Sequence, residues 1–419
     1  MAAPDSRTNL VAIYGWLFID WVAQGMFMGA QIGLAQRMGP SFGKICGPVY
    51  ALGIVMGMPV MGKLSDSKGR KAGLAADSFV GTMIPSFMQT CCIASDLGMG
   101  PLLALSWLWG AAGCATSVVA ASLGDTLPQA KRAKYTGYAL ADMFWGMAVG
   151  FSISGSLTDQ AHCSLIAGIL SGLSGLWMLG FVVETNPFKE ESATTENTEY
   201  MPASEIITNG SMLTMFFVTW CQFFTYSMFE SASTLAVKDV WGQDGASFPI
   251  FGGILGAIFA LTVLGPLVEA LGIRQGLALG HGLRMFGFFL FAICWRGPRC
   301  IPSVSWAAVM IGIQLIDATA NAFITMLVPQ KARGTAIGLN KSCGGFGRML
   351  GPYSALTLYA ADYALIPFYL AGFISIAAIT AVLYGLKGAE DSVKARELSQ
   401  PFLEYCMEGR KDTAVERSI

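Results

Sequence analysis

Six ionisable side chains interrupt stretches of otherwise apolar sequence, and their chemistry stands out first. A charged group within an apolar helix is costly in a membrane, so such groups usually carry protons, bind solutes or pair with one another. A carboxyl group in a poorly solvated place holds a proton more readily and releases it when its surroundings change. The six residues are Asp20, Asp142, Glu230, Arg284, Asp317 and Arg348.

Asp20 and Glu230 are the principal candidates for a proton or substrate site. Asp20 lies near the middle of one apolar run, and Glu230 lies toward the end of another. The alternative for either residue is a hydrogen bond or ion pair that fixes the packing of helices. Asp142 is a further candidate of the same kind.

A polar stripe accompanies a third carboxylate. Asp317 follows Gln314 by three residues and precedes Asn321 by four, so the three side chains share one face of a helix. This stripe can line a solute cavity. Arg284 suits a structural ion pair as well as a binding role, and the sequence leaves both open.

The composition indicates which elements must position these groups. Of the 419 residues, 54% are hydrophobic and only 13% are charged, which is too apolar for a soluble protein of this size. The 26 Lys and Arg are balanced by 27 Asp and Glu, so no basic surface is expected to attract nucleic acid. No metal-ligand spacing, nucleophile–base pair or phosphate-binding glycine loop is evident. We therefore expect a protein of the lipid bilayer that is not an enzyme and needs no metal or other cofactor.

Twelve apolar runs are long enough to cross a membrane, which takes about 20 helical residues. The sequence thus predicts an all-α membrane protein with twelve transmembrane helices. The runs lie near residues 10–34, 43–63, 73–95, 100–122, 136–157, 163–183, 211–235, 247–270, 276–295, 303–327, 335–360 and 364–386.

A polar, acidic segment divides these runs into two sets of six. We predict that residues 186–210 form a linker between halves at 10–185 and 211–388, with tails at 1–9 and 389–419. Lys and Arg are more numerous in the loops after even-numbered runs, so both tails and the linker are expected in the cytoplasm. The sequence does not indicate which membrane holds the protein.

One piece of sequence recurs about two hundred residues later. GKLSDSKGRK at 62–71 returns as GPLVEALGIR at 265–274, which pairs Asp66 with Glu269 and Gly69 with Gly272 at an offset of 203. PQAKRAKYTG at 128–137 returns as PQKARGTAIG at 329–338 at an offset of 201. Two matches at nearly one offset indicate a duplication, and parallel repeats around a central site are a known transporter architecture.

On these motifs the chain resembles the major facilitator superfamily. GKLSDSKGRKAGL is similar to the signature G-x-L-[AS]-D-[RK]-x-G-R-[RK] between helices 2 and 3 of that family, with Ser67 in place of a basic residue. GDTLPQAKRAKYTG after helix 4 and MFESASTLAV in helix 7 resemble the drug:proton antiporter-like, tetracycline-resistance-like branches. The resemblance implies two pseudo-symmetric six-helix halves.

The resemblance also implies a conformational latch. In that family the loop aspartate, here Asp66, caps the cytoplasmic end of helix 11 in one conformation, while Arg70 pairs with Asp125. The alternative is that the loop only anchors the chain through its positive charges. The expected latch residues are Gly62, Asp66, Gly69, Arg70, Lys71, Asp125 and Arg132.

Glycines in helix 5 are similar to a glycine-rich element of the family's antiporters. We expect Gly146, Gly150 and Gly155 to pack closely on a partner helix, and Gly347 and Gly351 are their repeat counterparts. The family's usual proline is replaced by Phe151, and helix 4 lacks the antiporters' arginine, so proton coupling would depend on the carboxylates alone.

The resulting hypothesis is a monomeric secondary active transporter. It moves a small amphipathic organic solute by alternating access, with protons as the coupling ion of an antiport. One alternative is facilitative or proton-coupled uptake of a polar nutrient. The other, from a different class, is a transporter-like receptor or scaffold that does not cycle, against which the presence of the latch residues counts.

Overall fold

The computed structural model describes residues 6–113, 115–157, 159–186, 201–241, 247–298, 300–361, 363–389 and 391. These residues are almost entirely helical, and the described chain contains no strand. The helices of the first half are α1 (Ser6–Met38), α2 (Pro40–Lys68), α3 (Arg70–Ala76), the π-helix η1 (Asp77–Met83), α4 (Ile84–Ala94), α5 (Met99–Ala112), α6 (Ala115–Thr126), α7 (Gln129–Ser156) and α8 (Gln160–Phe181).

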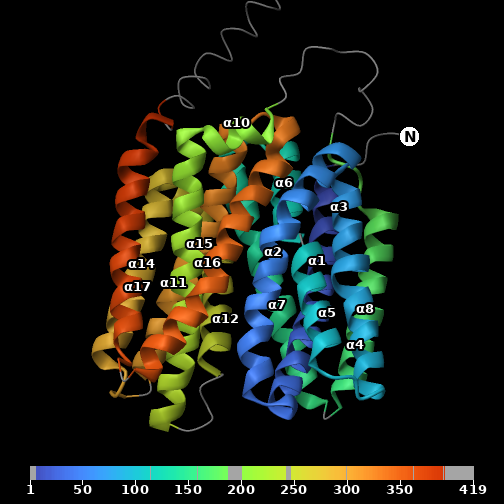
Figure 1. Ribbon diagram of the computed structural model, residues 1–419. Helices are drawn as coiled ribbons and strands as arrows, with labels where there is room; N and C mark the ends of the chain where they lie inside the picture. The colour runs from blue at the N-terminus through green and yellow to red at the C-terminus, as the bar shows by residue number, and fades with distance from the viewer. Residues whose placement is uncertain are drawn as a thin grey trace, which may run out of the picture.

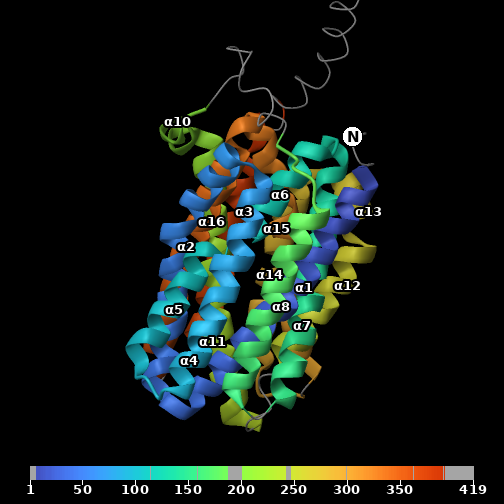
Figure 2. The ribbon, with the colours of Figure 1, turned by 90° about the vertical axis from the view of Figure 1, so that its right-hand side faces the viewer.

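The second half repeats the order of the first. Its helices are α10 (Ala203–Thr208), α11 (Gly210–Trp241), α12 (Ser247–Thr262), α13 (Leu264–Leu271), α14 (Ile273–Cys294), α15 (Cys300–Leu327), the 3-10 turn η3 (Gln330–Ala332), α16 (Arg333–Ala360), α17 (Ile366–Thr380) and the π-helix η4 (Ala381–Gly385). The halves lie side by side, blue to green and yellow-green to red (Figure 1). The view from the side shows their helices running along one common direction (Figure 2).

Each of the twelve predicted runs falls on one helical column of this bundle. Among the described residues, eight helical segments are long and apolar enough to cross a membrane, with α5 and α6 counted as one. The number is nine if α12 and α13, which meet at a bend of 60°, form one span. The other columns are α3–η1–α4, α7 and α16, which contain more polar residues. α7 and α16 are each 28 residues long, about 42 Å, so their length suffices to cross a bilayer.

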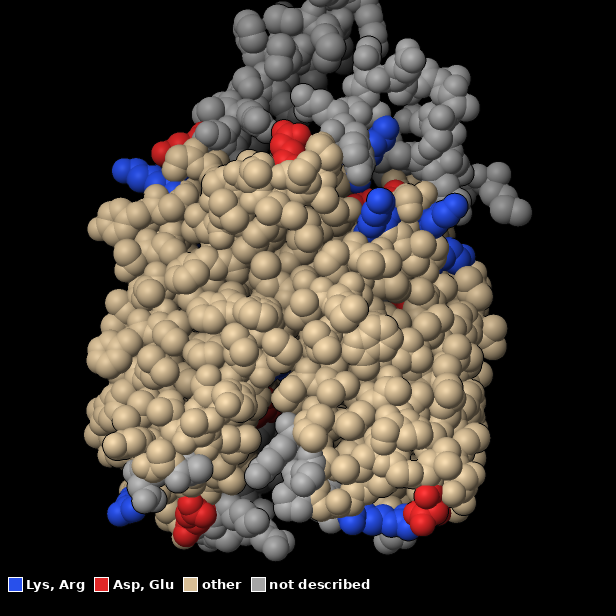
Figure 3. Space-filling model, in the orientation of Figure 1, with Lys and Arg blue, Asp and Glu red and all other residues tan. Residues whose placement is uncertain are grey.

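The surface of the bundle is that of a membrane protein. Large apolar side chains such as Val60, Leu176, Ile293 and Phe373 are more than half exposed along its sides. Charged side chains gather at the two ends, and the broad belt between them is uncharged (Figure 3). Exposure of such an apolar belt to water would be unfavourable, whereas the hydrocarbon core of a lipid bilayer can surround it without that cost.

The duplication predicted from the sequence is present in the backbone. Gly69 and Gly272, paired at the offset of 203, have φ of 105° and 83° and join α2 to α3 and α13 to α14. This left-handed region favours glycine because other residues meet their own Cβ there. Both copies thus make the same turn at the same end of the bundle.

The glycine pairs of the repeat also make equivalent helix contacts. A Cβ at Gly146 would lie 2.7 Å from the carbonyl oxygen of Phe18, and one at Gly347 would lie 2.6 Å from that of Trp220. Gly150 and Gly351 approach α1 and α11 in the same way. Small residues let these backbones touch, as membrane helices require. Gly155 does not share this role, because no described residue outside its own helix comes within 4 Å of its Cβ position.

The segment predicted as a linker is partly ordered as a helix. Residues 187–200 lie outside the described chain, but α10 lies across the end of the bundle (Figure 1) and buries Ile206 in a core cluster with Met212 and Ile324. The sequence analysis missed this helix, which is held on the second half by the single apolar side chain of Ile206. The first helix begins at Ser6, inside the predicted tail, and the described part of the other tail is limited to 389 and 391.

Candidate functional site

The carboxylate of Asp66 joins the two halves at the end of the bundle that holds the turn at Gly69. Its Oδ1 accepts a hydrogen bond from the Gly334 N–H at 2.9 Å, and its Oδ2 accepts from the Thr335 N–H at 2.7 Å and the Thr335 hydroxyl at 2.6 Å. α16 begins at Arg333, so these N–H groups are among those that a helix N-terminus leaves without partners. An anion there also meets the positive end of the helix dipole.

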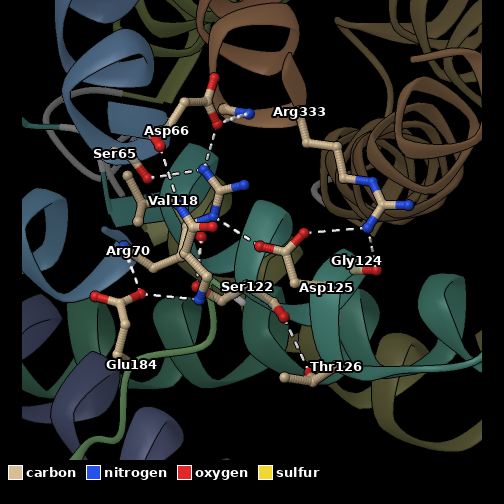
Figure 4. A network of polar contacts seen from close by, with 12 residues as sticks. Ser65, Asp66, Arg70, Val118, Ser122, Gly124, Asp125, Thr126, Glu184 and Arg333 are labelled. Carbon is tan, nitrogen blue, oxygen red and sulfur yellow. Dashed lines mark hydrogen bonds and ion pairs between the residues drawn. The ribbon is translucent and has the colours of Figure 1, made fainter. Parts of the chain in front are cut away.

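Arg70 links Asp66 to a second carboxylate. Its Nη1 lies 2.5 Å from Asp66 Oδ1, and its Nε lies 2.8 Å from Asp125 Oδ2 on α6 (Figure 4). The Arg70 side chain is 2% exposed. Both ion pairs are therefore largely shielded from water. Shielding strengthens charge-assisted hydrogen bonds of this kind.

Asp125 bridges the halves through Arg333, a residue that the sequence analysis did not select. Arg333 Nη1 lies 3.1 Å from Asp125 Oδ1 and donates to the Gly124 carbonyl oxygen at 2.7 Å. Arg132, its counterpart in the repeat, donates from Nη1 to Thr325 Oγ1 at 3.4 Å and so crosses in the opposite direction. The repeat could have identified Arg333, because PQKAR places it opposite Arg132.

The remaining latch residues fix the geometry of the turn. A Cβ on Gly62 would lie 2.3 Å from the Gly334 carbonyl oxygen, so glycine permits the contact of α2 with α16. Lys71 Nζ donates to the Leu179 carbonyl oxygen at 2.7 Å. Glu184, also not selected from the sequence, accepts from the backbone N–H groups of Arg70 and Lys71 at 2.8 and 3.2 Å. We call this whole set of contacts the latch.

Asp20 lies at mid-bundle but faces its own half. Its carboxylate is fully buried and accepts hydrogen bonds from the hydroxyls of Ser78, Ser171 and Ser174 at 3.0, 3.2 and 3.0 Å, and from Gln24 Nε2 at 2.7 Å. The serines come from η1 and α8, which pack against α1 within the first half. This geometry is that of a carboxylate that fixes helix packing.

Glu230 lies in a group that includes both halves. It is half-buried on α11, and the Tyr226 hydroxyl donates to its Oε1 at 3.4 Å. Arg348 of α16 interacts electrostatically with Glu230, and its guanidinium lies 5.7 Å from the centre of the Tyr50 ring on α2. Glu230 and Asp20 are therefore not members of one cluster, although both lie within spans.

Asp142 is half-buried on α7, the helix that packs on α12 and α15 of the second half. Its Oδ2 has no hydrogen-bond partner among the described residues, and the carboxylate is close enough to Tyr14 of α1 to interact electrostatically.

The stripe on α15 divides into a paired and an unpaired part. Asp317 Oδ1 lies 2.9 Å from Lys341 Nζ of α16, and both side chains are about nine-tenths buried. Gln314 is 1% and Asn321 2% exposed. Both polar side-chain atoms of Gln314 and the Oδ1 atom of Asn321 have no hydrogen-bond partner in the described chain. Arg284, fully buried on α14, donates from Nη2 to the Gln222 carbonyl oxygen at 2.6 Å and to Thr225 Oγ1 at 2.7 Å.

Asp77 is a buried carboxylate that the sequence analysis missed. It begins the π-helix η1, and its Oδ1 accepts from the Ala115 N–H at 2.8 Å. The fourth column is interrupted between Ala112 and Ala115, so Asp77 caps the first N–H group of the second segment. A helix break within an apolar run leaves little trace in sequence, which explains the omission.

The two ends of the bundle differ in how closely the halves approach. α2 packs on α16, and α6 and α7 pack on α15. At the latch end, the contacts of Asp66 with Gly334 and of Asp125 with Arg333 hold the halves together. At the other end, a hollow opens between the halves, and acidic and basic atoms are visible in its depth (Figure 3). The described parts of α1 and α11 do not pack closely on each other. The molecule is thus closed at one end and open at the other.

Two six-helix halves of one ancestry, joined at one end and separated at the other, define a membrane transporter of the major facilitator type. The chain belongs to the Major Facilitator Superfamily, whose family model matches residues 13–295 and 215–405.

Individual relatives agree with this assignment. The chain is 26% identical over 325 residues to the class G tetracycline resistance protein of Vibrio anguillarum, covering 75% of this chain and 79% of that protein. It is 25% identical over 382 residues to the class C protein of Escherichia coli, covering 85% and 91%. Among solved structures, the human organic anion transporter MFSD10 (TETRAN) has a similar fold, with a TM-score of 0.77 at 14% identity over 91% of this chain and 100% of the other.

Proposed function

We propose that this transporter exports a small amphipathic organic solute in exchange for protons, by alternating access between the two halves. The observation that carries the proposal is the latch. It closes one end through groups that lie more than two hundred residues apart in the chain, while a hollow is open at the other. A contact that exists in only one of two states is what an alternating equilibrium needs.

The strength of the latch suits a reversible step. Three hydrogen bonds to Asp66 and one ion pair between Asp125 and Arg333 cross between the halves. Hydrogen bonds to charged groups contribute about 1.5–3 kcal/mol each. Their sum is of the size that solute binding and a proton gradient can offset.

The latch end is proposed to face the cytoplasm. It carries Lys63, Lys68, Lys71 and Lys131 at the helix ends that border short connections, and such places are enriched in Lys and Arg on the cytoplasmic side. In this orientation the hollow opens to the opposite side, where an exporter releases its solute and takes up protons.

Proton coupling is proposed for the two half-buried carboxylates near the other half, Glu230 and Asp142. Each can gain or lose a proton when opening or closing of the hollow changes the exposure of its carboxyl group to water. Water favours the charged carboxylate, whereas an apolar site favours the protonated form. The similarity to tetracycline resistance proteins supports tetracycline as the first solute to test.

The experiment uses purified full-length protein in proteoliposomes, with tetracycline movement followed under an imposed pH gradient. Antiport predicts uphill movement of the drug against the direction of proton flow, which collapses when an ionophore removes the gradient. Movement that is only downhill and indifferent to the gradient would favour facilitative transport. A polar nutrient that moves while amphipathic solutes do not would support the uptake alternative, and no movement of any solute would favour the receptor.

A further inference from the structure

Arg284 is a fully buried cation at the middle of the membrane span. Along the axis of α14, Arg284 lies about 16 Å from Ile273, the residue that begins this helix at the latch end of the bundle. This distance is roughly half of a hydrocarbon core of about 30 Å. A Cβ at Gly312 would lie 2.5 Å from Arg284 Cγ, so the missing side chain on α15 lets Arg284 pass toward α11. Its counterpart in the first half is Gly81, so this cation is specific to the second half.

No carboxylate of the described chain neutralises Arg284 directly. Its Nη2 donates to the neutral acceptors Gln222 O and Thr225 Oγ1, while Nε and Nη1 have no hydrogen-bond partner there. Asp317 interacts with it only at longer range, and Asp317 Oδ1 already contacts Lys341 Nζ at 2.9 Å. The group thus holds two cations and one anion.

Further polar atoms beside Arg284 lack partners. The Gln222 side-chain amide, on the helix that Arg284 contacts, has neither its oxygen nor its nitrogen hydrogen-bonded within the described chain. His281, three residues before Arg284 and on the same helix face, has both ring nitrogens without partners and is fully buried. An amide and an imidazole can each donate one hydrogen bond to an anion.

A buried charge without a counter-ion is strongly unfavourable, and such a group inside a membrane span is functional by default. A purely structural link to α11 would need only a neutral donor. Arginine instead offers a planar fork of N–H groups that matches a carboxylate in two parallel hydrogen bonds. Two nitrogens of Arg284, Nε and Nη1, donate no hydrogen bond within the described chain and could donate to such a carboxylate.

We propose that Arg284 binds the anionic group of the transported solute, so that this transporter selects small organic solutes with an acidic oxygen group, of which a carboxylate is the simplest. Gln222 and His281 add neutral donors beside it, and Lys341 keeps Asp317 from neutralising the guanidinium. This inference rests on the proposed transport function and specifies the charge of its solute.

The test measures binding apart from transport. Purified full-length protein in detergent is titrated with three matched probes, 1-naphthoate, 1-naphthylmethanol and 1-naphthylmethylammonium, while thermal unfolding is followed. A ligand that binds only the folded state raises the unfolding midpoint. We expect naphthoate to raise the midpoint and the neutral and cationic probes to have little effect.

The variants then locate the site. Arg284→Gln should weaken naphthoate binding at least tenfold, and Arg284→Lys, which keeps the charge but not the fork, should weaken it less. Arg296→Gln is the matched control, since Arg296 follows the same helix and is exposed. If Arg284→Gln does not fold, the naphthoate affinities of the other three proteins decide the question. Arg284→Lys should then bind more weakly than both wild type and Arg296→Gln.

Two outcomes would overturn the inference. Wild-type protein that binds the ammonium probe and ignores naphthoate, or Arg284 variants that bind naphthoate as tightly as wild type, would exclude an anion site at Arg284. If proteoliposomes still move tetracycline, the transport proposal survives such a result. Naphthoate binding without movement of any solute would instead keep the site and reject transport.

Discussion

Asp66 and Glu269 occupy equivalent positions of the repeat, yet only Asp66 reaches across to the opposite half. The Asp66 carboxylate accepts hydrogen bonds from Gly334 and Thr335 at the start of α16. Glu269 is exposed, and no hydrogen bond or ion pair joins it to another residue of the described chain. This difference supplies a matched control for every test of the latch.

Asp66→Asn should reduce transport at least tenfold, while Glu269→Gln should stay within twofold of wild type. The asparagine side chain retains one acceptor oxygen but loses the charge that faces the helix dipole and Arg70, a loss of about 2 kcal/mol or more. Flux in proteoliposomes measures both variants. Equal effects of the two substitutions would mean that the loop acts only through its overall charge.

Asp125 and Arg333 should be energetically coupled across the halves. Asp125→Asn deprives Arg333 of its carboxylate, whereas Arg333→Gln leaves Asp125 paired with Arg70 alone. Each single variant already loses the contact between the two residues, so the double variant should lose less stability than the sum of the singles. A double-mutant cycle on thermal or denaturant unfolding should give a coupling of about 1 kcal/mol or more. The pair Asp125→Asn with Lys63→Gln, whose lysine is exposed, should be additive.

Gly150→Ala and Gly351→Ala should both impair folding, whereas Gly155→Ala should be tolerated. A Cβ at Gly150 would lie 2.3 Å from the Val22 carbonyl oxygen, and one at Gly351 would lie 2.6 Å from that of Phe224. Helix backbones cannot yield to such contacts without separating. The yield of monodisperse protein and its unfolding midpoint provide the measurement, and a stable Gly150→Ala variant would contradict this packing.

Asp317→Asn or Lys341→Met alone should destabilise the protein by about 3–5 kcal/mol, because each leaves one buried charge unpaired. The double variant should recover most of that loss, since both charges are then removed. Unfolding of the four proteins in detergent makes the comparison. No recovery in the double variant would show that the two groups contribute separately.

Glu230→Gln and Asp20→Asn should fail in different ways. Glu230→Gln should abolish the dependence of tetracycline movement on the pH gradient while downhill exchange persists, because the site can no longer exchange a proton. Asp20→Asn should chiefly lower stability, because four donors converge on that carboxylate. Loss of coupling in Asp20→Asn with unchanged stability would assign the proton to Asp20 instead.

The sequence predicted the features that depend on local composition and on repetition. Apolar runs gave the position of every helical column, and the repeat with its resemblance to a known family predicted the contacts of Asp66 and Arg70 with α16 and Asp125. Arg333 and Glu184 were missed because their role arises where chain segments meet, although the alignment of Arg132 with Arg333 carried a signal.

Other features depended on tertiary geometry that no periodicity encodes. The helical period places Asp20 on a face of α1 but does not say whether that face meets the other half or the serines of η1 and α8. The interruption near Ala115 lies within an apolar run with no proline to mark the break, and the residue that caps it, Asp77, belongs to another run. Side-chain direction and helix irregularity are therefore what the structure adds.

The positive-φ glycines Gly69 and Gly272 preserve the same turn in both copies, whereas the carboxylates beside them have diverged in what they do. After a duplication, a second copy relieved of its contact can accumulate changes that the first cannot. Selection for altered transport in a growing culture should therefore recover substitutions around Glu269 and α13 far more often than around Asp66 and α16. The older symmetry would then persist in the backbone long after it has vanished from the side chains.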